Sequence, residues 1–340
     1  INFAPTITMY FSEGKRYQAC SSKRDASGTF MERCSDITLS GNTYHFMHGM
    51  GILAQLCNNL TVENCNFTPD YSRGRTTASF ADMIHASMCK GLVKVVNCVF
   101  DGSRDDIINV HGNHFVIQKI KGNQMFVKFA HPQAYGFNAF DKGDIVEFVS
   151  PTTLLPIEQN EIVASELTSP RITKLTLKTA PSLKVKSGHC LENATNTASL
   201  YVDNIVGKNI PTRGILVTTR QSVVIKNSTF ERLFMSGILM SDDAKGWYES
   251  GYVRDVTIDG NTFDNCLDLI VDIRPETKNL CCSKPVHKNI LIKNNIIKSE
   301  SPSKFFLKNV ENVTFDHNTF EGNPNFIISK CHAKNITTIN

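Results

Sequence analysis

Long apolar runs and blocks of basic residues are both absent from this 340-residue sequence. No apolar stretch approaches the ~20 residues that a membrane-spanning helix needs, so we expect no membrane insertion. The formal net charge is only +4, and no Lys/Arg block stands out, which argues against nucleic acid as the main partner. A signal peptide and an initiator Met are also missing. We therefore interpret the chain, which starts at Ile1, as a processed or trimmed fragment.

Several motifs of catalysis and cofactor binding are missing as well. The sequence has no Gly-rich phosphate loop, no G-x-S-x-G elbow and no H-E-x-x-H motif. Among the 11 Cys residues no pair has CxxC-type zinc spacing, apart from the adjacent Cys281 and Cys282. We therefore expect neither a bound metal nor a cofactor. Hydrophobic residues make up 41% of the chain, which is sufficient for a sizeable core and excludes disorder.

One pattern recurs along the chain: an alternating apolar stretch, then Asn or Cys, a spacer, and in most copies an aromatic residue. Its copies are "DITLSGNTYHF", "NLTVENCNF", "LVKVVNCVF", "SVVIKNSTF", "DVTIDGNTF", "NILIKNNII" and "NVTFDHNTF". The shortest spacing between copies is 23 residues, and longer spacings contain an additional loop. Alternation with β-branched residues predicts strands, and no segment sustains a helical period of 3.6 residues.

Self-similarity near 23 residues with strands in every copy predicts an all-β fold, a right-handed parallel β-helix. The Leu-rich consensus of a leucine-rich repeat is absent, and a β-propeller would need about 40 residues per blade. Because the turns stack about 4.8 Å apart, equivalent residues should form Asn ladders and Phe columns. Cys57 and Cys89 share one column, and Cys65 and Cys98 share another, so we expect buried free thiols. The six Asn-x-Ser/Thr sequences fall mostly in the repeat, and we interpret them as structural.

The repeat is interrupted in the middle of the chain. There the segments "HFVIQKI", "QMFVKFA", "DIVEFVS", "EIVASEL" and "ITKLTLK" predict five short strands of a small antiparallel barrel. We therefore predict N-terminal β-helix coils over residues 1–113, an inserted β-barrel domain over 114–199, and C-terminal coils over 200–340. Because the insertion leaves directly after His111, it is placed to form the wall of a cleft.

Two successive turns carry carboxylates at an equivalent position. Asp82 and Asp106 are 24 residues apart, one turn, so their Cα atoms should lie about 5 Å apart. In a flat strand Asp105 would point to the other face, but at a turn or bulge it could join the same cluster. Mutual repulsion would raise the pKa of at least one of these residues. The residues expected at the same position in other copies are Gly51, Gly214 and Gly237.

Imidazole and amide side chains accompany these carboxylates. His85 aligns with Asn109, and His111 aligns with Ser87 on the next turn. We favour a functional site, in which His85, Asn109 and His111 bind substrate, over an Asp ladder that caps backbone N–H groups. The same His and Asp residues could ligate a divalent metal, but no recognised ligand spacing supports that alternative.

The segment "SGILMSDDAKGWYESG", residues 236–251, places an aromatic residue among carboxylates. It supplies the candidate substrate-binding residues Asp242, Asp243, Trp247 and Glu249. The apolar face of a sugar ring can pack on the indole of Trp247, which is the only Trp in the chain, while its hydroxyl groups bond acids. The alternative is that Trp247 packs within its own loop. Arg75, on another long loop, could bind substrate or be a solvated cation.

Four segments resemble glycoside hydrolase family 110, whose members are exo-acting α-1,3-galactosidases. They are "GMGILAQLCNNLTVENC", "GRTTASFADMIHASMCKG", "DDIINVHG" and "TRGILVTTRQSVVIKNSTFERLFMSGILMSDDAKGWYESGYVRDVTIDGNTF". The resemblance covers about residues 45–265 and implies a right-handed β-helix with inserted barrel-like domains. It also implies metal-free hydrolysis with inversion of the anomeric centre, and it assigns the catalytic carboxylates to Asp82, Asp105 and Asp106.

The resemblance further implies a glycan partner that ends in α-1,3-linked galactose, as in the blood group B determinant or linear galactosyl-galactose glycans. It implies a secreted, periplasmic or cell-surface location, while the formation of a homo-oligomer stays open. Inversion needs two carboxyl groups about 6.5–9.5 Å apart, and Asp82 and Asp106 are too close unless their side chains splay. We therefore expect Asp105 and Asp106 to position the water, with Asp82 or a residue across the cleft as the acid.

Two other functions stay open at this point. A polygalacturonase or polysaccharide lyase would need several Arg or Lys residues in the cleft for its anionic substrate, whereas the matched turns offer mostly acids. A non-catalytic glycan-binding or adhesin module would keep the fold without the reaction. Replacing Asp105 and Asp106 by Asn separates the last alternative, because a module would be unchanged by the substitutions.

Overall fold

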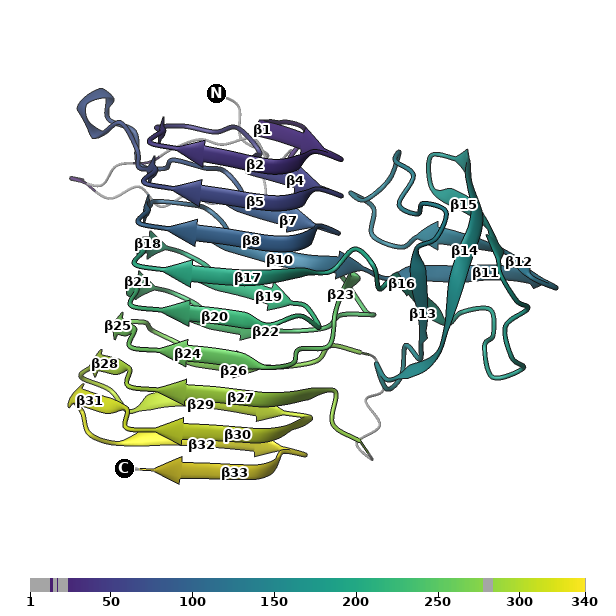
Figure 1. Ribbon diagram of the computed structural model, residues 1–340. Helices are drawn as coiled ribbons and strands as arrows, with labels where there is room; N and C mark the ends of the chain where they lie inside the picture. The colour runs from purple at the N-terminus through teal and green to yellow at the C-terminus, as the bar shows by residue number, and fades with distance from the viewer. Residues whose placement is uncertain (1–12, 15–16, 18–23, 278–283, 340) are drawn as a thin grey trace.

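The structure, a computed structural model, describes residues 13–14, 17, 24–277 and 284–339, and it forms a tall column of parallel strands beside a smaller barrel (Figure 1). Each full turn of the column adds one strand to each of three sheets. Within the described residues the only helical element is a 3-10 turn, η1 (Tyr71–Arg73). None of the described segments forms a helix long and apolar enough to cross a membrane. The predicted all-β fold, a parallel β-helix, is confirmed.

The three sheets run along the column in the order of the chain. The first sheet contains β1 (Ser27–Glu32), β4 (Met50–Gln55), β7 (Ile84–Ser87), β10 (Ile108–Asn113), β19 (Ile215–Thr218), β22 (Ile238–Met240), β26 (Leu269–Ile273), β29 (Ser303–Lys308) and β32 (Phe326–Cys331), with β23 (Glu249–Ser250) antiparallel to β10. The second sheet contains β2 (Ser35–Ser40), β5 (Asn58–Glu63), β8 (Lys90–Val96), β17 (Ala198–Asp203), β20 (Val223–Lys226), β24 (Val256–Asp259), β27 (His287–Lys293), β30 (Val310–Asp316) and β33 (Lys334–Ile339). The third sheet contains β3 (Thr43–Tyr44), β6 (Asn66–Phe67), β9 (Val99–Asp101), β18 (Val206–Ile210), β21 (Thr229–Leu233), β25 (Thr262–Asp264), β28 (Ile296–Ser299) and β31 (Thr319–Gly322).

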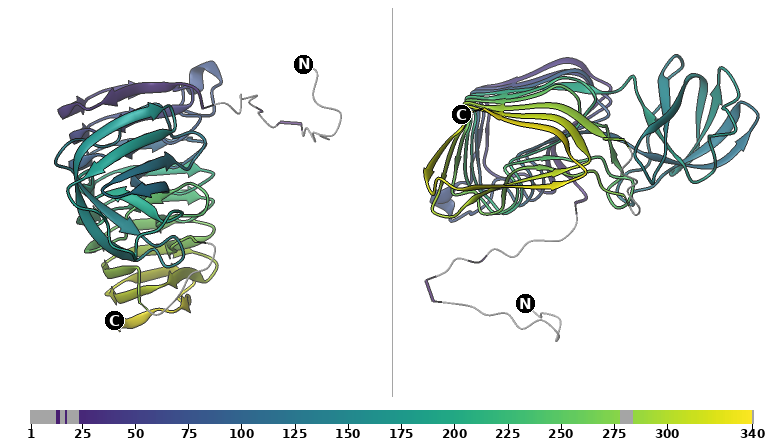
Figure 2. Two further views of the ribbon diagram at one scale, coloured as in Figure 1. Left: turned by 90° about the vertical axis from the view of Figure 1, so that its right-hand side faces the viewer. Right: turned by 90° about the horizontal axis from the view of Figure 1, so that it is seen from below.

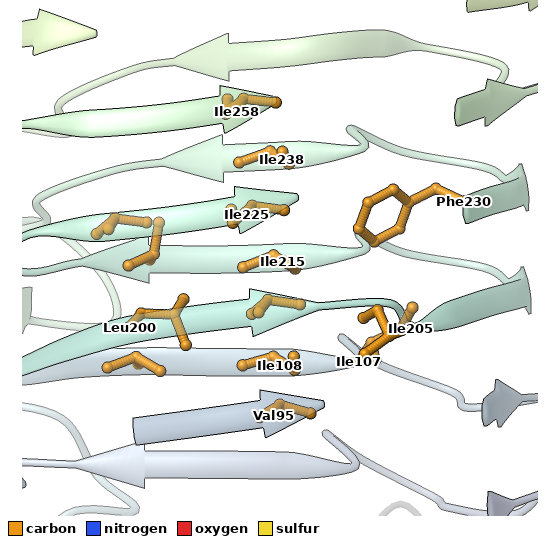
Figure 3. Close-up of a cluster of buried hydrophobic side chains, with 14 of the residues drawn as sticks. Val95, Ile107, Ile108, Leu200, Ile205, Ile215, Ile225, Phe230, Ile238 and Ile258 are labelled. Carbon is orange, nitrogen blue, oxygen red and sulfur yellow. The ribbon is translucent and has the colours of Figure 1, made fainter. Parts of the chain in front are cut away.

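A ladder of buried isoleucines sets the register of the first sheet. Ile108 on β10 pairs with Ile84 on β7 and with Ile215 on β19, and the ladder continues to Ile238 on β22. All four side chains are fully buried. Figure 3 shows Ile108, Ile215 and Ile238 in a row that faces side chains of the second sheet, such as Ile225. Because side chains alternate along a strand, the residues that directly follow these isoleucines, such as His85 and Asn109, point outward.

This ladder corrects the predicted alignment of the glycines by one residue. Gly51, Gly214 and Gly237 each directly precede the buried Ile of their turn, whereas Asp82 and Asp106 lie two residues before theirs. The glycines are therefore in register with Met83 and Ile107. The position equivalent to Asp106 on the next turn is occupied by Arg213, one residue before Gly214. The buried Ile decides the register, since a slip of one residue would turn it out of the core.

Aromatic rings stack along the third sheet as predicted. The ring of Phe67 lies 4.7 Å from that of Tyr44 and 4.8 Å from that of Phe100, measured between ring centroids. Gly207 follows in this column, and a Cβ atom placed on it would lie 2.3 Å from Cδ1 of Ile107. Ile107 thus fills the gap in the aromatic column. Figure 3 shows Ile107 at the same end of the core as Phe230. The packing of Ile107 fixes the preceding bend to the core, and this bend carries Asp105 and Asp106.

The predicted polar columns are present too. Cys65 donates its backbone N–H to Sγ of Cys98 at 3.5 Å, and every Cys of the described part has a free thiol. Cys281 and Cys282 lie outside the described residues. Amide side chains bond from turn to turn, as from Asn261 to Asn295 at 3.0 Å. Of the Asn-x-Ser/Thr residues, several use their side-chain amide in such bonds, namely Asn59, Asn227, Asn312 and Asn335. Asn193 instead donates to Asp144 within the barrel.

The insertion is a closed barrel beside the column (Figure 2). Its strands, in the order in which they pair, are β11 (Phe115–Lys121), β12 (Gln124–Phe129), β15 (Ile172–Leu177), β14 (Pro156–Ser169), β13 (Ile145–Val149) and β16 (Cys190–Asn193). Five strands were predicted, and the sixth, β16, was missed because its four residues "CLEN" show no alternation with β-branched residues. The barrel has its own apolar core around residues such as Phe115 and Phe148.

Candidate active site

A pocket of about 230 Å³ lies between the outer face of the first sheet and the barrel. Its floor is formed by outward-facing residues of β7 and β10, and one wall is formed by barrel residues between β12 and β13. The barrel residues in this wall are His131, Gln133, Ala134, Tyr135 and Phe137. The prediction that the insertion walls a cleft is therefore confirmed.

Three carboxylates meet at the floor of the pocket. One oxygen atom from each of Asp82, Asp105 and Asp106 lies within 4.8 Å of the others. Asp82 and Asp106 are on adjacent turns, and the backbone N–H of Asp106 donates to Oδ1 of Asp82 at 3.2 Å. The chain bends before β10, where the N–H of Asp105 donates to Oγ of Ser103 at 3.0 Å. This bend is why two neighbouring residues in sequence, Asp105 and Asp106, turn toward the same cluster.

Two arginines that the sequence prediction missed balance these carboxylates. Nε of Arg213 lies 2.8 Å from Oδ1 of Asp106, and a guanidinium nitrogen of Arg24 lies 2.5 Å from Oδ2 of Asp105. The correct register of the turns would have revealed Arg213, whereas Arg24 belongs to no repeat and has no comparable signal. The oxygen cluster is compact enough for a cation, and the guanidinium groups already supply positive charge to it.

The three carboxyl groups differ in their electrostatic surroundings. The pKa of Asp106 is raised to about 7, first by burial and also by the charge of Asp82, against the opposing charge of Arg213. Burial and the charge of Asp82 also raise the pKa of Asp105. Burial acts in the same direction on Asp82, but the hydrogen bond and charge of His85 outweigh it and lower the pKa of Asp82. The cluster therefore combines an ionised carboxylate with groups that hold protons more tightly.

Two imidazoles form a continuous chain with Asp82. Nδ1 of His85 lies 2.7 Å from Oδ2 of Asp82, and Nε2 of His85 lies 2.9 Å from Nε2 of His111. Nδ1 of His111 lies 2.7 Å from the carbonyl oxygen of Gly112. The strands carry these side chains as predicted, since His85 is paired with Asn109 in the register of β7 and β10.

Glu249 enters the site through the short strand β23. This strand pairs antiparallel with the end of β10, which brings a segment far away in sequence to the pocket. Nδ2 of Asn109 lies 3.1 Å from Oε1 of Glu249 and 3.4 Å from Oδ2 of Asp82. Asn109 thus links the carboxylate cluster to a carboxylate on a different part of the wall.

Trp247 lies at the mouth of the pocket and is 53% exposed. Its ring centroid is 4.8 Å from that of His131 on the barrel, and the guanidinium of Arg24 lies 5.9 Å from it. The indole is thus available to a ligand, and its neighbours come from both the column and the barrel. Trp247 therefore does not pack within its own loop, which was the alternative, but contacts the barrel.

Three other predicted site residues lie away from the pocket. Asp242 is buried, and its Oδ1 lies 2.7 Å from Nε2 of His114. Asp243 accepts hydrogen bonds from the backbone N–H groups of the loop that follows it. The exposed Arg75 places its guanidinium 4.1 Å from the ring centroid of Phe46. In this structure Asp243 organises the loop of the Trp, Asp242 pairs with the buried His114, and Arg75 stacks at the surface.

Fold and site together define a parallel β-helix protein with an inserted barrel and a lateral acidic pocket. Residues 189–340 match the family described as a right-handed β-helix region, and residues 124–191 match the one described as GLAA-B β-barrel domain II.

Curated relatives identify the family. Over 308 residues the chain is 36% identical to α-1,3-galactosidase A of Akkermansia muciniphila, which covers 90% of this chain and 51% of that protein. It is 38% identical to α-1,3-galactosidase A of Bacteroides thetaiotaomicron, covering 89% of this chain and 54% of that protein. It is 32% identical to α-1,3-galactosidase B of Bacteroides fragilis, covering 89% and 55%. The chain spans about half the length of these relatives, and it belongs to their family, as its resemblance to glycoside hydrolase family 110 indicated.

Proposed function

We propose that this chain hydrolyses terminal α-1,3-linked galactose from glycans and inverts the anomeric centre. The observation that carries the proposal is the cluster of Asp82, Asp105 and Asp106 at the floor of a pocket with an exposed indole at its mouth. The names of the curated relatives, all α-1,3-galactosidases, support the same substrate class. A glycan substrate also supports a secreted, periplasmic or cell-surface location.

Inverting hydrolysis requires a carboxylate that activates water and an acid on the opposite side of the sugar. The oxygen atoms of the Asp cluster approach each other too closely to supply both from within. Glu249 is the carboxylate across the pocket. Asn109 bridges it to Asp82, so the two bridged oxygens are at most ~6.5 Å apart, and this pair does not exceed the lower limit of the inverting range. We therefore assign water activation to the Asp cluster and proton donation to Glu249.

Sugar recognition follows from the other pocket residues. The exposed indole of Trp247 suits the apolar face of a pyranose ring. His85, His111 and Asn109 line the floor. Oδ1 of Asn109 has no hydrogen-bond partner among the described residues and can accept a sugar hydroxyl, whereas both ring nitrogens of each imidazole already bond to protein groups. We keep Asn109 as a substrate-binding residue, place His85 and His111 beneath the substrate as lining residues, and leave Arg75, Asp242 and Asp243 out of direct contact.

The charge of the pocket favours a neutral substrate over the uronic acid of a polygalacturonase or lyase. Both guanidinium groups in the pocket, those of Arg24 and Arg213, are paired with Asp105 and Asp106. They therefore offer little uncompensated positive charge to an anionic sugar. Binding without catalysis, as in an adhesin, is an outcome of the following experiment.

The test is galactose release by the chain from matched α-1,3-, α-1,4- and α-1,6-linked substrates, with and without a fucose branch. We expect release from the α-1,3-linked substrates, and an NMR time course should detect β-galactose first. The substitutions Asp82→Asn, Asp105→Asn and Asp106→Asn should each lower kcat by ~10²–10⁴-fold while substrate binding remains. The surface substitution Asp141→Asn serves as control.

Glu249→Gln tests the acid separately. Loss of proton donation should slow substrates with poor leaving groups strongly, but galactosides with an acidic phenol as leaving group should react at nearly the wild-type rate. Equal losses on both kinds of substrate would remove Glu249 from the acid role. First-formed α-galactose would refute inversion, and binding without hydrolysis by the unsubstituted chain would identify a module.

A further inference from the structure

The hydrogen-bond chain from Gly112 to Asp82 fixes where protons reside. A backbone carbonyl oxygen only accepts hydrogen bonds, so Nδ1 of His111, 2.7 Å from the Gly112 oxygen, carries a proton. Burial lowers the pKa of His111, so its ring is neutral and its Nε2 is an unprotonated acceptor. Nε2 of His85, 2.9 Å away, must then be the donor between the two rings.

The remaining proton lies between His85 and Asp82, whose Nδ1 and Oδ2 are 2.7 Å apart. If it resided on Asp82, the pair would be neutral, and if it resides on His85, the pair is an imidazolium and a carboxylate. The other partners of Asp82 select the second state. Its Oδ1 accepts the N–H of Asp106, and its Oδ2 lies 3.4 Å from the amide nitrogen of Asn109, so both oxygens are already acceptors.

We infer that His85 is a positioning residue that remains an imidazolium, held between His111 and Asp82, and that it keeps Asp82 a carboxylate throughout the reaction. His111 sets this state by presenting an acceptor to Nε2 of His85. The consequence for catalysis rests on the proposed function: the variable proton of the cluster belongs to Asp105 and Asp106, and Asp82 supplies constant negative charge beside them.

The charged groups around His85 agree with this assignment. On its own turn it faces Asp82, and from the following turn Asp105 and Asp106 lie in the same cluster. From β23 the carboxylate of Glu249 also faces the His pair, at 3.7 Å from Nε2 of His111. On the preceding turn His85 is in register with Leu53, which is apolar. The nearby cations, Arg24 and Arg213, bond to the Asp residues and not to the imidazole.

Nitrogen-15 NMR of the full chain with labelled His tests the proton positions directly and needs no enzymatic activity. At pH 7.5 we expect both nitrogens of His85 to be protonated, and His111 to show a protonated Nδ1 and an unprotonated Nε2. The variant His85→Asn identifies the His85 signals by their loss. An unprotonated nitrogen on His85 at this pH would overturn the inference, whether or not the chain proves to be a galactosidase.

Kinetics test the positioning role. In His85→Asn the amide nitrogen can still donate to Asp82, but the positive charge is gone, so Asp82 should take up a proton more readily. We expect the acidic limb of the kcat/KM profile to move up by ~1 pH unit and kcat to fall by ~10-fold or more, with KM changed less. The matched control is His317→Asn, because His317 forms an exposed pair with Asp316 far from the pocket.

A second pair of variants covers the case in which His85→Asn does not fold. His111→Gln keeps an acceptor oxygen for His85, so the profile should keep its wild-type limbs. His111→Leu removes the acceptor and should move the acidic limb in the same direction as His85→Asn. If His85→Asn and His111→Leu lower kcat but leave the pH profile of kcat/KM unshifted, the two residues have a merely structural role. That result would refute the positioning role.

Discussion

Asp106 is a carboxyl group whose protonation changes near neutral pH. Burial raises its pKa to about 7, although Arg213 opposes this rise with a 2.8 Å hydrogen bond to Oδ1. Its Oδ2 has no hydrogen-bond partner among the described residues. The side chain is 1% exposed, so burial disfavours its charged form. A group in this situation responds to pH both in stability and in activity.

The pH dependence of stability should therefore carry the signature of Asp106. Its folded pKa is above the value of 3.8 for an ordinary Asp, so the folded state binds more protons between about pH 4 and pH 7. The free energy of unfolding of the wild type should fall relative to that of Asp106→Asn as the pH rises through this window, by up to ~4 kcal/mol. Urea unfolding at pH 4, 6 and 8 measures this difference.

The control for this measurement is Asp203→Asn. Burial would raise the pKa of Asp203, but hydrogen bonds, from Asn227 first, outweigh it and lower the pKa. Its contribution to stability is therefore present above the unfolded pKa and is lost as the pH falls, the opposite sign to Asp106. If the wild type and Asp106→Asn gave parallel curves from pH 4 to pH 8, the raised pKa of Asp106 would be disproved.

The connection between β22 and β23 is held in shape by one carboxylate. Oδ1 of Asp243 accepts the backbone N–H groups of Lys245 and Gly246 at 2.6 and 2.9 Å, and Oδ2 accepts that of Trp247 at 2.6 Å. Three N–H groups that would otherwise lack partners are satisfied by this side chain, as in a helix cap. The loop thereby presents the indole at the pocket mouth and leads directly into β23 with Glu249.

Asp243→Ala should loosen this connection without removing a pocket residue. We expect KM for an α-1,3-galactoside to rise ~3- to 10-fold with kcat changed less than KM, because the indole is no longer fixed, and stability to fall by ~1–3 kcal/mol. Since Trp247 is the only Trp in the chain, its fluorescence reports the loop directly and should shift to longer wavelength. Asp264→Ala, at the end of β25 and outside this connection, should leave the emission unchanged, and unchanged emission in Asp243→Ala would refute the capping role.

The barrel and the column are joined by a buried ion-pair cluster. Arg220, which follows β19, bonds to Glu147 on β13 at 2.9 Å and to Glu192 on β16. Its guanidinium also lies 4.6 Å from the ring centroid of Tyr252. Both glutamates are buried and belong to the barrel, whereas Arg220 belongs to the column. The cluster is therefore a joint between the two parts. Because the barrel supplies a wall of the pocket, this joint holds the two halves of the pocket together.

Arg220→Met should therefore affect the whole molecule. Two buried carboxylates lose their counter-charge, so we expect a loss of ~3–5 kcal/mol in stability. Hydrogen exchange should accelerate in β13 and β16, while the column keeps its protection, since each part has its own apolar core. KM should rise more than kcat falls. The control Lys226→Met removes a surface pair with Asp203, and unchanged exchange in β13 and β16 would contradict the joint.

The parts of the fold and site that followed the repeat were predictable. The alternation of β-branched residues every 23 residues predicted the stacked turns, and it placed Asp82 beside Asp106 and His85 beside Asn109. Arg213 was missed because the glycine turns were aligned one residue out of register, and the buried isoleucines show the correct alignment. The strand β16 was missed because a four-residue segment carries too little pattern.

Periodicity in a sequence specifies which residues are neighbours along a coil, because each turn repeats the inward and outward positions of the last. That information alone defined the column, the paired carboxylates and the place of the insertion. It contains nothing about groups that approach from other directions, so Glu249 on β23, Arg24 and the barrel residue His131 joined the pocket only through long-range folding. Burial raises the pKa of Asp106, whereas burial lowers that of His85 and the hydrogen bond and charge of Asp82 outweigh it. These surroundings exist only once the chain has closed around the site.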